Sequence, residues 1–516
     1  MEDVIYNNLN YPIITWTVFL PVLGAIIVLL LRSATAIRWT SLIVTGLTFI
    51  ISLPLLTGFD KTTHKMQFVE WHQWIPSWGI NYFVGIDGIS ILFILLTTLL
   101  SILSVLVSWK AIANKAKEFH ISILIMEAGM LGVFVSLDFF LFYIFWEAML
   151  IPMFLLIGVW GGENRVYAAV KFFLYTLIGS VLMLVGIVVL YFTGGETLNI
   201  LALSSEQYSL NLQFWLFLAF FAAFAVKVPM FPFHTWLPDA HTEAPTAGSV
   251  ILAGVLLKMG AYGFLRFSMP MFPDATMMFL KPIMILSVIA IIYGALVCLA
   301  QKDLKRLIAY SSVSHMGFVT LGIFALNTQG VEGGILQMLN HGIITGALFL
   351  MIGIIYERTH TRKIADYGGF AGLVPWYAGF FIVLTFASIG LPGMNGFIGE
   401  FLIIFGAFRA KMVYGVLAAT GIILGAGYML WLYQRVFFEK ADTERWATGD
   451  HKVWDLDMRE IITLVPLIIL IFWVGFYPEV FLSYMHTSVA HLLENINQTN
   501  YAGGDHLLTR LITGIF

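Results

Sequence analysis

Apolar stretches of the length that crosses a bilayer recur from one end of the chain to the other. Ile13–Leu31, Ile89–Val107, Ile178–Phe192 and Ile461–Phe476 are four of them, and an α-helix needs about 20 such residues to span the hydrocarbon layer. Helix breakers and short polar loops separate the stretches. The pattern predicts an all-α integral membrane protein with about fourteen transmembrane helices, near residues 13–31, 40–57, 87–108, 120–136, 139–159, 167–192, 212–231, 246–267, 277–299, 306–326, 331–356, 375–408, 412–438 and 460–482.

Two segments fall outside this pattern. Residues 59–85 are too polar to span a membrane, and we expect an external loop there, anchored at the membrane surface by Trp71, Trp74 and Trp78. The tail after Tyr484 is expected to be a short amphipathic stretch or disordered.

The composition agrees with a membrane location. Hydrophobic residues make up 59% of the chain and charged residues only 11%, whereas soluble domains carry about 25% charged residues. No basic patch with interleaved aromatic residues is present, which argues against nucleic-acid binding. The single cysteine, Cys298, excludes an internal disulfide and is expected to be a buried, small apolar residue. Glu2 and Asp3 replace the basic start of a cleavable signal peptide, so we expect none.

Lysines and arginines in the loops set an orientation. With the N-terminus outside, the cation-rich loops near 110–117, 302–306 and 358–363 fall on the inner side, as the positive-inside rule requires. Both termini are then predicted to face outward. Lys171 and Arg435 lie near the inner ends of their helices, where long side chains are expected to reach water.

Two other lysines lie deep within apolar stretches. Lys258 sits about halfway along its helix, inside the run Ser249–Met259. A lysine at that depth costs at least about 2.5–3.5 kcal/mol, so it needs a partner or an aqueous cavity. Lys227 comes directly before Pro229 and Pro232, which remove amide donors and break the seventh helix. Irregular backbone inside a membrane is tolerated where it lines a cavity, so this break marks a candidate translocation path.

Buried acids accompany the buried lysines. Glu147 lies near mid-membrane within Phe139–Ile157, and Glu127 lies in the middle of the preceding helix. Glu400 follows residues 391–393, Leu-Pro-Gly, which should break the twelfth helix as the prolines break the seventh. A buried carboxyl group either pairs with a cation or stays neutral. Buried groups of both signs favour a relay for protons or ions over isolated structural ion pairs.

Two histidines extend this candidate relay. His315 follows the serine-rich stretch 311–314, and His341 follows Asn340, each near the middle of its helix. Imidazole titrates closest to physiological pH and is suited to proton transfer. A lone histidine on a helix is more often a core residue, but two on adjacent helices beside hydroxyl and amide groups favour the relay.

Motifs for cofactors are missing from the sequence. His234 and His241 stand near acidic residues, but no HExxH spacing is present and prolines interrupt the segment, so a metal site is not predicted. The chain has no GxGxxG and no GxxxxGK[ST] phosphate loop, and no ligand pattern for haem. We expect no nucleotide, no metal and no other cofactor on this chain.

The two broken helices indicate an internal repeat. They are five helices apart, and an odd offset gives the two units opposite orientation, a plan that recurs in transporters. We therefore expect helices 1–3 in residues 1–119, a first five-helix repeat in 120–267, an inverted second repeat in 277–438, and a last helix with a tail in 439–516. Lys227 then corresponds to Glu400 by position in the repeat.

Two segments carry a resemblance to a known family. Residues 227–241 (KVPMFPFHTWLPDAH), followed by Leu256-Leu257-Lys258, and residues 303–317 (DLKRLIAYSSVSHMG) closely resemble the antiporter-like membrane subunits of respiratory complex I and their Mrp-type antiporter relatives. The resemblance extends over about residues 85–480. M-type subunits, equivalent to mitochondrial chain 4, are the most similar, because the chain has no room for the lateral helix of L-type subunits. They also carry a glutamate where Glu400 stands, and the L- and N-types a lysine.

The resemblance implies a function and roles for the buried residues. It implies a proton-translocating subunit of NADH:quinone oxidoreductase in a bacterial inner membrane, with both termini periplasmic, lying beside L- and N-type subunits. Redox chemistry would take place on other subunits. By motif, Glu147 and Lys227 resemble the input pair, Lys258 the central lysine, His315 and His341 the polar links, and Glu400 the exit-side acid.

Two alternatives remain open at this point. The first is a subunit of an Mrp-type sodium/proton antiporter or a membrane-bound hydrogenase, which Glu400 and the genomic neighbours would discriminate. The second is a membrane scaffold that only anchors partners. A scaffold would tolerate apolar replacements of the buried charges.

Overall fold

The computed structural model describes residues 4–439, 446 and 453–497, and most of them are helical. The helices of the first half are α1 (Ile13–Leu30), α2 (Ala34–Thr57), α3 (Ile91–Ala111), α4 (Ala116–Val135), α5 (Phe139–Ala148), α6 (Leu150–Trp160), α7 (Arg165–Thr193), α8 (Ile200–Ser205), α9 (Leu210–Lys227) and α10 (Trp236–Glu243). One long helical span follows, composed of α11 (Thr246–Ile251), the π-helical turn η2 (Leu252–Leu256), α12 (Leu257–Gly263), the π-helical turn η3 (Phe264–Ser268) and α13 (Met269–Met271).

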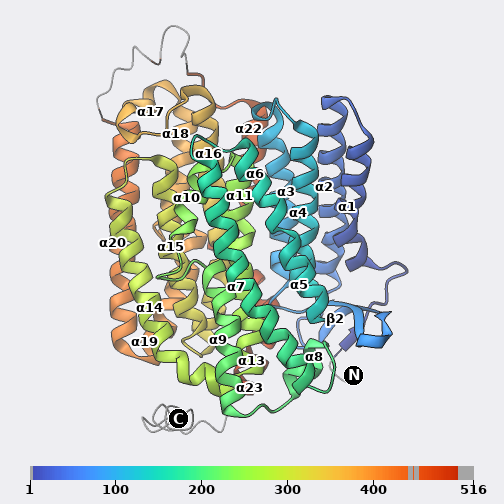
Figure 1. Ribbon diagram of the computed structural model, residues 1–516. Coiled ribbons are helices and arrows are strands. Elements are labelled where there is room, and N and C mark those ends of the chain that lie inside the picture. Colours follow the sequence, from blue (N-terminus) through green and yellow to red (C-terminus); the bar gives the residue numbers. More distant parts are fainter. Residues whose placement is uncertain (1–3, 440–445, 447–452, 498–516) are drawn as a thin grey trace.

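The second half is also helical. Its helices are α14 (Pro273–Leu299), α15 (Leu304–Ile323), α16 (Thr328–Thr359), α17 (Phe370–Leu373), α18 (Pro375–Ser388), α19 (Asn395–Ala410), α20 (Met412–Phe437), α22 (Met458–Phe476) and α23 (Glu479–Asn497). Two short 3₁₀ turns are η1 (Pro76–Trp78) and η4 (Ile364–Asp366). Figure 1 shows an upright bundle, with β1 (Val4–Tyr6), β2 (Met66–Ile75), α8 and α23 at one end and α17 at the other.

The all-α membrane fold expected from the sequence is confirmed. Within the described residues, 12 helical spans are long and apolar enough to cross a membrane, by length and composition. The other two expected spans are also helical, but one is more polar and the other is interrupted. One is α15, which carries polar side chains including His315, and the other is the pair α18 and α19, which residues 389–394 interrupt.

Residues 59–85 contain a β-hairpin in place of the expected loop. β2 pairs antiparallel with β3 (Ile80–Ile86), and β1 adds to the other edge of β2 in parallel. The buried carboxylate of Glu70 on β2 accepts hydrogen bonds from the backbone amides of Ile14 (2.9 Å) and Thr15 (3.1 Å), so it caps the start of α1. The strands pair backbone groups that a loop would leave to water.

Several cations predicted to be exposed are buried and paired. Lys305, assigned to an inner loop, lies in the first turn of α15 and donates to the carbonyl of Ala244. Arg358 lies inside α16 and bonds to Glu460 at 2.7 Å. Lys171 pairs with Asp239 at 2.7 Å, and its side chain is 19% exposed. Lys305 and Arg358 are buried in helices because they find partners within the protein.

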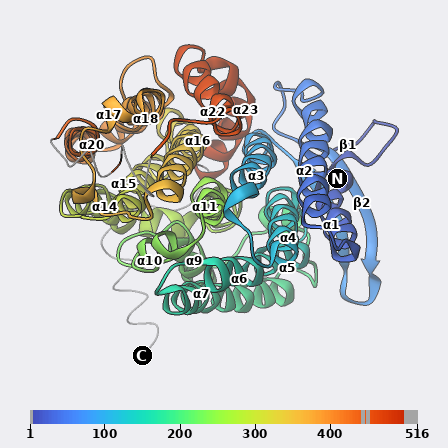
Figure 2. The same cartoon turned by 90° about the horizontal axis from the view of Figure 1, so that it is seen from above.

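The spans differ greatly in how far the protein encloses them. The spans Thr246–Met271 and Thr328–Thr359 are 100% buried over their most apolar windows, whereas α2 and α20 are 33% buried. Figure 2 shows α11 and α16 inside the bundle, with α1 and α20 at opposite edges. The enclosed spans therefore meet protein on all sides and can hold polar side chains away from lipid.

Both expected helix breaks are present. α9 ends at Lys227 and α10 begins at Trp236, while α18 ends at Ser388 and α19 begins at Asn395. In Figure 1 the pair α9 and α10 rises from the end that carries β2, and the pair α18 and α19 descends toward it. The two broken spans therefore run in opposite directions.

The tail after Tyr484 continues as a helix. α23 runs to Asn497, as the amphipathic alternative predicted, and residues 498–516 lie outside the described residues. His486 fastens α23 to the bundle, since its Nδ1 lies 2.6 Å from Glu332 Oε1 on α16 and its Nε2 lies 3.2 Å from Glu479 Oε1. The last described helix and β1 thus lie at the same end of the molecule.

This contact predicts a pH-dependent docking of α23. Partial burial lowers the pKa of His486, but hydrogen bonds and charge attraction from Glu332 and Glu479 outweigh it, and the net pKa is raised. A raised pKa gives stability that is present below the ordinary value of about 6.5 and is lost as pH rises through the value in the folded protein. Hydrogen-exchange protection factors of α23 should therefore fall as the pH rises above about 6.5.

The substitution His486→Gln supplies the control. It keeps a hydrogen-bonding side chain but cannot gain a charge, so the protection of α23 should depend much less on pH. An equal pH dependence in both proteins would contradict this account of docking.

A buried row of ionisable side chains

Lys258 is the centre of the polar interior. It lies on α12 within the enclosed span Thr246–Met271 and is 0% exposed. Its ammonium group donates to the carbonyl of Ala253, which belongs to the π-helical turn η2. π turns alter the regular backbone pairing and recur at functional sites. The second partner of the Lys258 Nζ is the Nδ1 of His341 at 2.6 Å.

His341 and His315 continue the row from α16 to α15. Their ring centroids are 5.9 Å apart, too far for a direct hydrogen bond. A cavity of about 10 Å³ touches both rings and is also lined by Gln337, Thr345 and Ser388. A space of this size accommodates about one water molecule when polar groups surround it. The two imidazoles are therefore within reach of each other through a single bridging water.

Glu400 ends the row on α19. Its Oε1 lies 2.9 Å from His315 Nδ1 and accepts a hydrogen bond from Gln337 Nε2 at 3.2 Å. Gly390, with φ of +69°, lies in the break between α18 and α19, where an added Cβ would stand 3.1 Å from Glu400 Oε2. The structure thus brings together four of the predicted residues, Lys258, His341, His315 and Glu400, in one series of contacts.

Lys227 lies at the other broken helix. It is the last residue of α9 and is 1% exposed, yet its Nζ has no hydrogen-bond partner among the described residues. The ammonium group stands 5.0 Å from the ring centroid of Trp146, a favourable cation–π distance. The carbonyl of Val226, close to the helix end, accepts a hydrogen bond from the Trp236 indole at 2.9 Å. Trp146 and Trp236 therefore both contact the end of α9 at the helix break.

Glu147 approaches Lys227 without touching it. The two interact electrostatically, but they form no ion pair within 4.0 Å in the described part of the chain, so the direct contact implied by an input pair is absent. Glu147 is half-buried near the end of α5, and a turn at Met149 separates α5 from α6. Pro152 explains this interruption, because its ring removes the amide that would bond to Ala148. The two helices still form one membrane span, Phe139–Trp160, as the sequence predicted.

The two lysines lie on helices that approach closely. Gly260, two residues after Lys258, packs against the end of α9, and an added Cβ would stand 2.7 Å from the Phe224 carbonyl oxygen and 2.9 Å from the Val228 amide nitrogen. Only glycine allows this distance between the backbones. The close packing couples the position of Lys258 to the helix break at Lys227.

His241 and Lys305 also belong to the polar interior, although the sequence analysis did not place them there. His241 is fully buried, stacks on Phe349 at 4.6 Å, and interacts electrostatically with Lys305 and Lys258. Lys305 is buried at the start of α15. The sequence signal was that both residues lie within the two family motifs. The sequence analysis assigned Lys305 to a loop, and it considered His241 only as a metal ligand, a role that it rejected. Glu127 is also fully buried, but it stands outside this row of contacts.

No metal centre is formed by the described residues. Among them no three His, Cys, Asp or Glu side chains lie together in a ligand arrangement. His234 packs between the rings of Phe231 and Tyr293, at 5.6 and 5.1 Å. Cys298 is buried and donates to the carbonyl of Leu307, as expected for a core residue.

The chemistry that this row permits is proton transfer. Lysine, histidine and glutamate side chains can each hold and release a proton, and successive members lie within hydrogen-bond distance or one water of each other. Because all four side chains are buried in the protein, the protons are separated from lipid. This arrangement defines a class: polytopic helical membrane proteins that hold ionisable groups in a chain across the bilayer interior.

Comparison with known proteins identifies the family. Residues 136–425 match the model of the NADH:quinone oxidoreductase/Mrp antiporter transmembrane family, and the chain belongs to this family. NADH-quinone oxidoreductase subunit M of Rhodobacter capsulatus is 52% identical over 470 residues, which cover 89% of this chain and 90% of that protein. NADH-ubiquinone oxidoreductase chain 4 of Marchantia polymorpha is 49% identical over 497 residues, covering 95% and 98%. The resemblance to M-type members is confirmed.

Solved structures share the fold. A chain of respiratory complex I from Thermus thermophilus with bound NADH is 32% identical, with a TM-score of 0.86 over 95% of this chain and 100% of that chain. A chain of the Mrp complex from Dietzia sp. DQ12-45-1b superposes with a TM-score of 0.81 at 21% identity over 94% and 99% of the two chains, which shows the fold alone.

The packing at Gly260 yields a prediction. Gly260→Ala forces a methyl group against the backbone of α9, and such overpacking costs about 1–3 kcal/mol. We expect less of the chain to accumulate in membranes, measured by immunoblotting against a second subunit. Gly46→Ala on α2 is the matched control, since an added Cβ there meets nothing within 4 Å. Equal amounts of both variants would contradict the close contact.

Proposed function

We propose that this chain is the M-type membrane subunit of a proton-translocating NADH:quinone oxidoreductase and carries protons across the bilayer. The observation that supports this most is the buried row Lys258, His341, His315 and Glu400, with contacts of 2.6 and 2.9 Å at its two ends. The relatives named subunit M and chain 4 match nearly the whole chain. As in that enzyme, the redox reaction would take place on other subunits, and its energy would drive the protons.

The direction of transport follows from the orientation proposed for the chain. In a bacterial inner membrane, the end with β1 and α23 would face the periplasm and the opposite end the cytoplasm. Protons would enter near Glu147 and Lys227. Lys305 and His241 would lie beside this entry route. The protons would then pass through Lys258 and leave beyond Glu400. L- and N-type subunits are the neighbours that the family implies.

The same proposal gives the fold an internal symmetry. Residues 120–267 and 277–438 would be two inverted five-helix repeats, after three helices in 1–119 and before a last helix in 439–516. The opposite directions of the broken spans α9–α10 and α18–α19 support this division. Lys227 beside the first break and Glu400 beside the second would then be counterparts, one basic and one acidic.

The proposed proton-transfer steps follow from the contacts between these buried residues. A change arriving from an adjacent subunit at half-buried Glu147 would alter its attraction for Lys227 across the gap between them. Among the described residues no hydrogen bond stabilises the charged form of Lys227, so it would release its proton toward Lys258. Lys258 would pass a proton to His341 along their hydrogen bond, and the bridging water would carry it to His315 and Glu400.

The antiporter and scaffold alternatives account for fewer of these observations. The Mrp-type chain is 21% identical, far below the subunit M relative at 52%. A scaffold has no use for Lys227, because a buried lysine without a hydrogen bond costs at least about 2.5 kcal/mol. An apolar residue would serve a scaffold better.

Substitutions at the entry side test the proposal. Lys227→Ala and Glu147→Gln should lower NADH-driven proton uptake by inverted membrane vesicles to about a tenth or less, since a relay without one of its groups loses orders of magnitude in rate. NADH oxidation with an artificial acceptor should stay normal, because it reports an assembled enzyme without transport. Lys302→Ala is the matched control, an exposed lysine outside the row.

Two results would count against the proposal. Unchanged uptake in both variants would mean that the entry pair serves only the fold. Uptake that depends on sodium in the buffer for the unsubstituted chain would favour the antiporter alternative.

A further inference from the structure

A pair of asparagine side chains joins α16 to the start of α19. Asn340 Nδ2 donates to the backbone carbonyl of Asn395 at 2.7 Å, and Asn395 Nδ2 donates to Asn340 Oδ1 at 3.2 Å. Both residues are 0% exposed. Because Asn395 is the first residue of α19, the two hydrogen bonds fix the point at which the broken span becomes helical again. We call Asn340 and Asn395 the amide clamp.

The amide clamp lies beside two members of the buried row. Asn340 directly precedes His341 on α16, and Asn395 lies five residues before Glu400 on α19. Gln337, three residues before Asn340, donates to Glu400 Oε1 at 3.2 Å. The same side of α16 therefore binds α19 both at its start and at its carboxylate.

Stability alone does not explain an amide at position 395. The Oδ1 atom of Asn395 is buried and has no hydrogen-bond partner among the described residues. A buried polar atom without a partner is unfavourable, and apolar side chains of similar shape would join two helices without that cost. Such an exception in a folded protein calls for another role of the residue.

The backbone next to the amide clamp is tightly enclosed. The break between α18 and α19 contains Gly390 and Gly393 at φ of +69° and +91°, conformations that favour glycine. A Cβ added at Gly475 on α22 would overlap the Gly393 carbonyl. A Cβ added at Gly396 would overlap the carbonyl of Ala387 at the end of α18. The break is thus packed against α22 and α18, and the clamp is its polar contact with α16.

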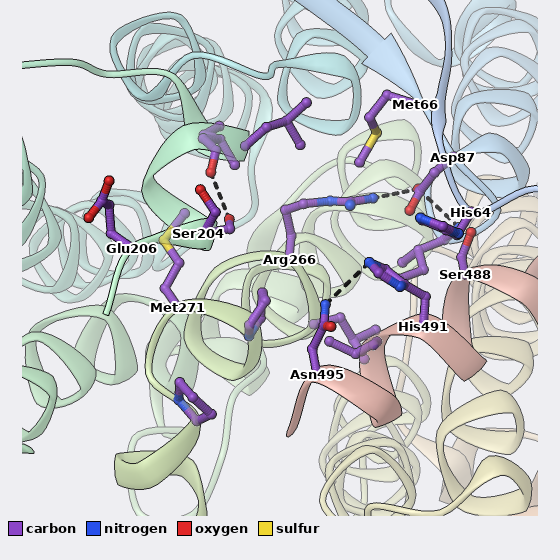
Figure 3. A pocket seen from close by; sticks show the side chains of 18 of the residues that line it. His64, Met66, Asp87, Ser204, Glu206, Arg266, Met271, Ser488, His491 and Asn495 are labelled. Atoms are coloured by element: carbon purple, nitrogen blue, oxygen red, sulfur yellow. Dashed lines mark hydrogen bonds and ion pairs between the residues drawn. The ribbon is translucent and has the colours of Figure 1, made fainter. Parts of the chain in front are cut away.

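The space beside the row is too small to compensate for a displaced side chain. The cavity between His315 and His341 has about 10 Å³, room for about one water molecule. A pocket of about 550 Å³ lies at the end of the bundle that carries β1 and α23, where Figure 3 shows Arg266 extending toward Asp87. The four residues of the row, all in the described part of the chain, lie outside its walls. Transfer between His315 and Glu400 therefore depends on their direct contact.

From this geometry we propose that Asn340 and Asn395 are positioning residues for proton transfer, which hold α19 in the register that places Glu400 against His315. The inference rests on the proposed function, which uses Glu400 and gives neither asparagine a role. The asparagines carry no proton themselves, because a carboxamide does not titrate at physiological pH. They act through the 2.9 Å contact between His315 Nδ1 and Glu400 Oε1.

Alanine substitutions test the amide clamp in the assembled enzyme. Asn340→Ala removes both hydrogen bonds and should lower NADH-driven proton uptake by inverted vesicles roughly tenfold, since a displacement of about 1 Å can cost about 100-fold in rate. Asn395→Ala removes one hydrogen bond, because the backbone carbonyl remains, and should cost less. NADH oxidation with an artificial acceptor and the amount of chain in the membrane should stay normal.

Asn327→Ala is the matched control. Asn327 precedes α16 and also binds α19, since its Nδ2 donates to the Gly406 carbonyl at 2.9 Å. The substitution therefore removes an amide hydrogen bond between the same two helices, but far along α19 from the break. Transport should remain normal in this variant.

Asn395→Asp separates positioning from a structural role. A protonated carboxyl group can donate to Asn340 Oδ1 as the amide does, whereas an ionised one only accepts. The transport rate of Asn395→Asp, divided by that of the unsubstituted enzyme, should therefore rise as the pH is lowered. The ionisable groups of the row are present in both proteins. Asn395→Ala should show no such rise, and a side chain that only fills space predicts a constant ratio for both variants.

The outcomes separate this inference from the proposed function. Full transport in Asn340→Ala and Asn395→Ala, with loss of transport in Lys227→Ala, would overturn the positioning role alone. Full transport in Lys227→Ala as well would overturn the proposed function. A loss in Asn327→Ala equal to that in Asn340→Ala would overturn the positioning role, because any contact between the helices would then matter equally. Should the alanine variants fail to assemble, Asn395→Asp decides: a rise at low pH supports the inference and a constant ratio overturns it.

Discussion

The hydrogen bond between Lys258 and His341 constrains how the surrounding helices are arranged. An ammonium group inside a bilayer must be shielded from lipid and given a partner. The structure meets both needs by placing the two residues on its two fully enclosed spans, Thr246–Met271 and Thr328–Thr359, 2.6 Å apart at their nitrogen atoms. The edge helices, such as α2 and α20, provide the shield and carry no member of the row.

Irregular backbone lies beside three of the buried charged groups. The π turn η2 presents the Ala253 carbonyl to Lys258, the end of α9 leaves Lys227 against Trp146, and Gly390 leaves space for Glu400. In a membrane such interruptions are tolerated only where protein or water satisfies the freed groups. The breaks and the charges therefore occur together, and each would be unfavourable without the other.

The sequence predicted the helices and their breaks because a span must be apolar and proline cannot continue a helix. It also predicted the row Lys258, His341, His315 and Glu400, because polar residues in apolar runs are conspicuous. It did not predict that Lys305 and Arg358 are buried, since pairing with Ala244 and Glu460 depends on segments far apart in the chain. The gap between Glu147 and Lys227 and the pocket beside Arg266 arise from tertiary packing, which no local pattern records.

The central claim is that Lys258 carries protons, and one substitution tests it most directly. Lys258→Met keeps an unbranched side chain in the enclosed site and removes the exchangeable proton. Reconstituted into liposomes, the complete enzyme with this change should build a proton gradient on NADH addition at roughly a tenth of the normal rate or less, with normal NADH oxidation by an artificial acceptor. A gradient formed at the normal rate would contradict the account, because the row would then be a feature of the fold alone.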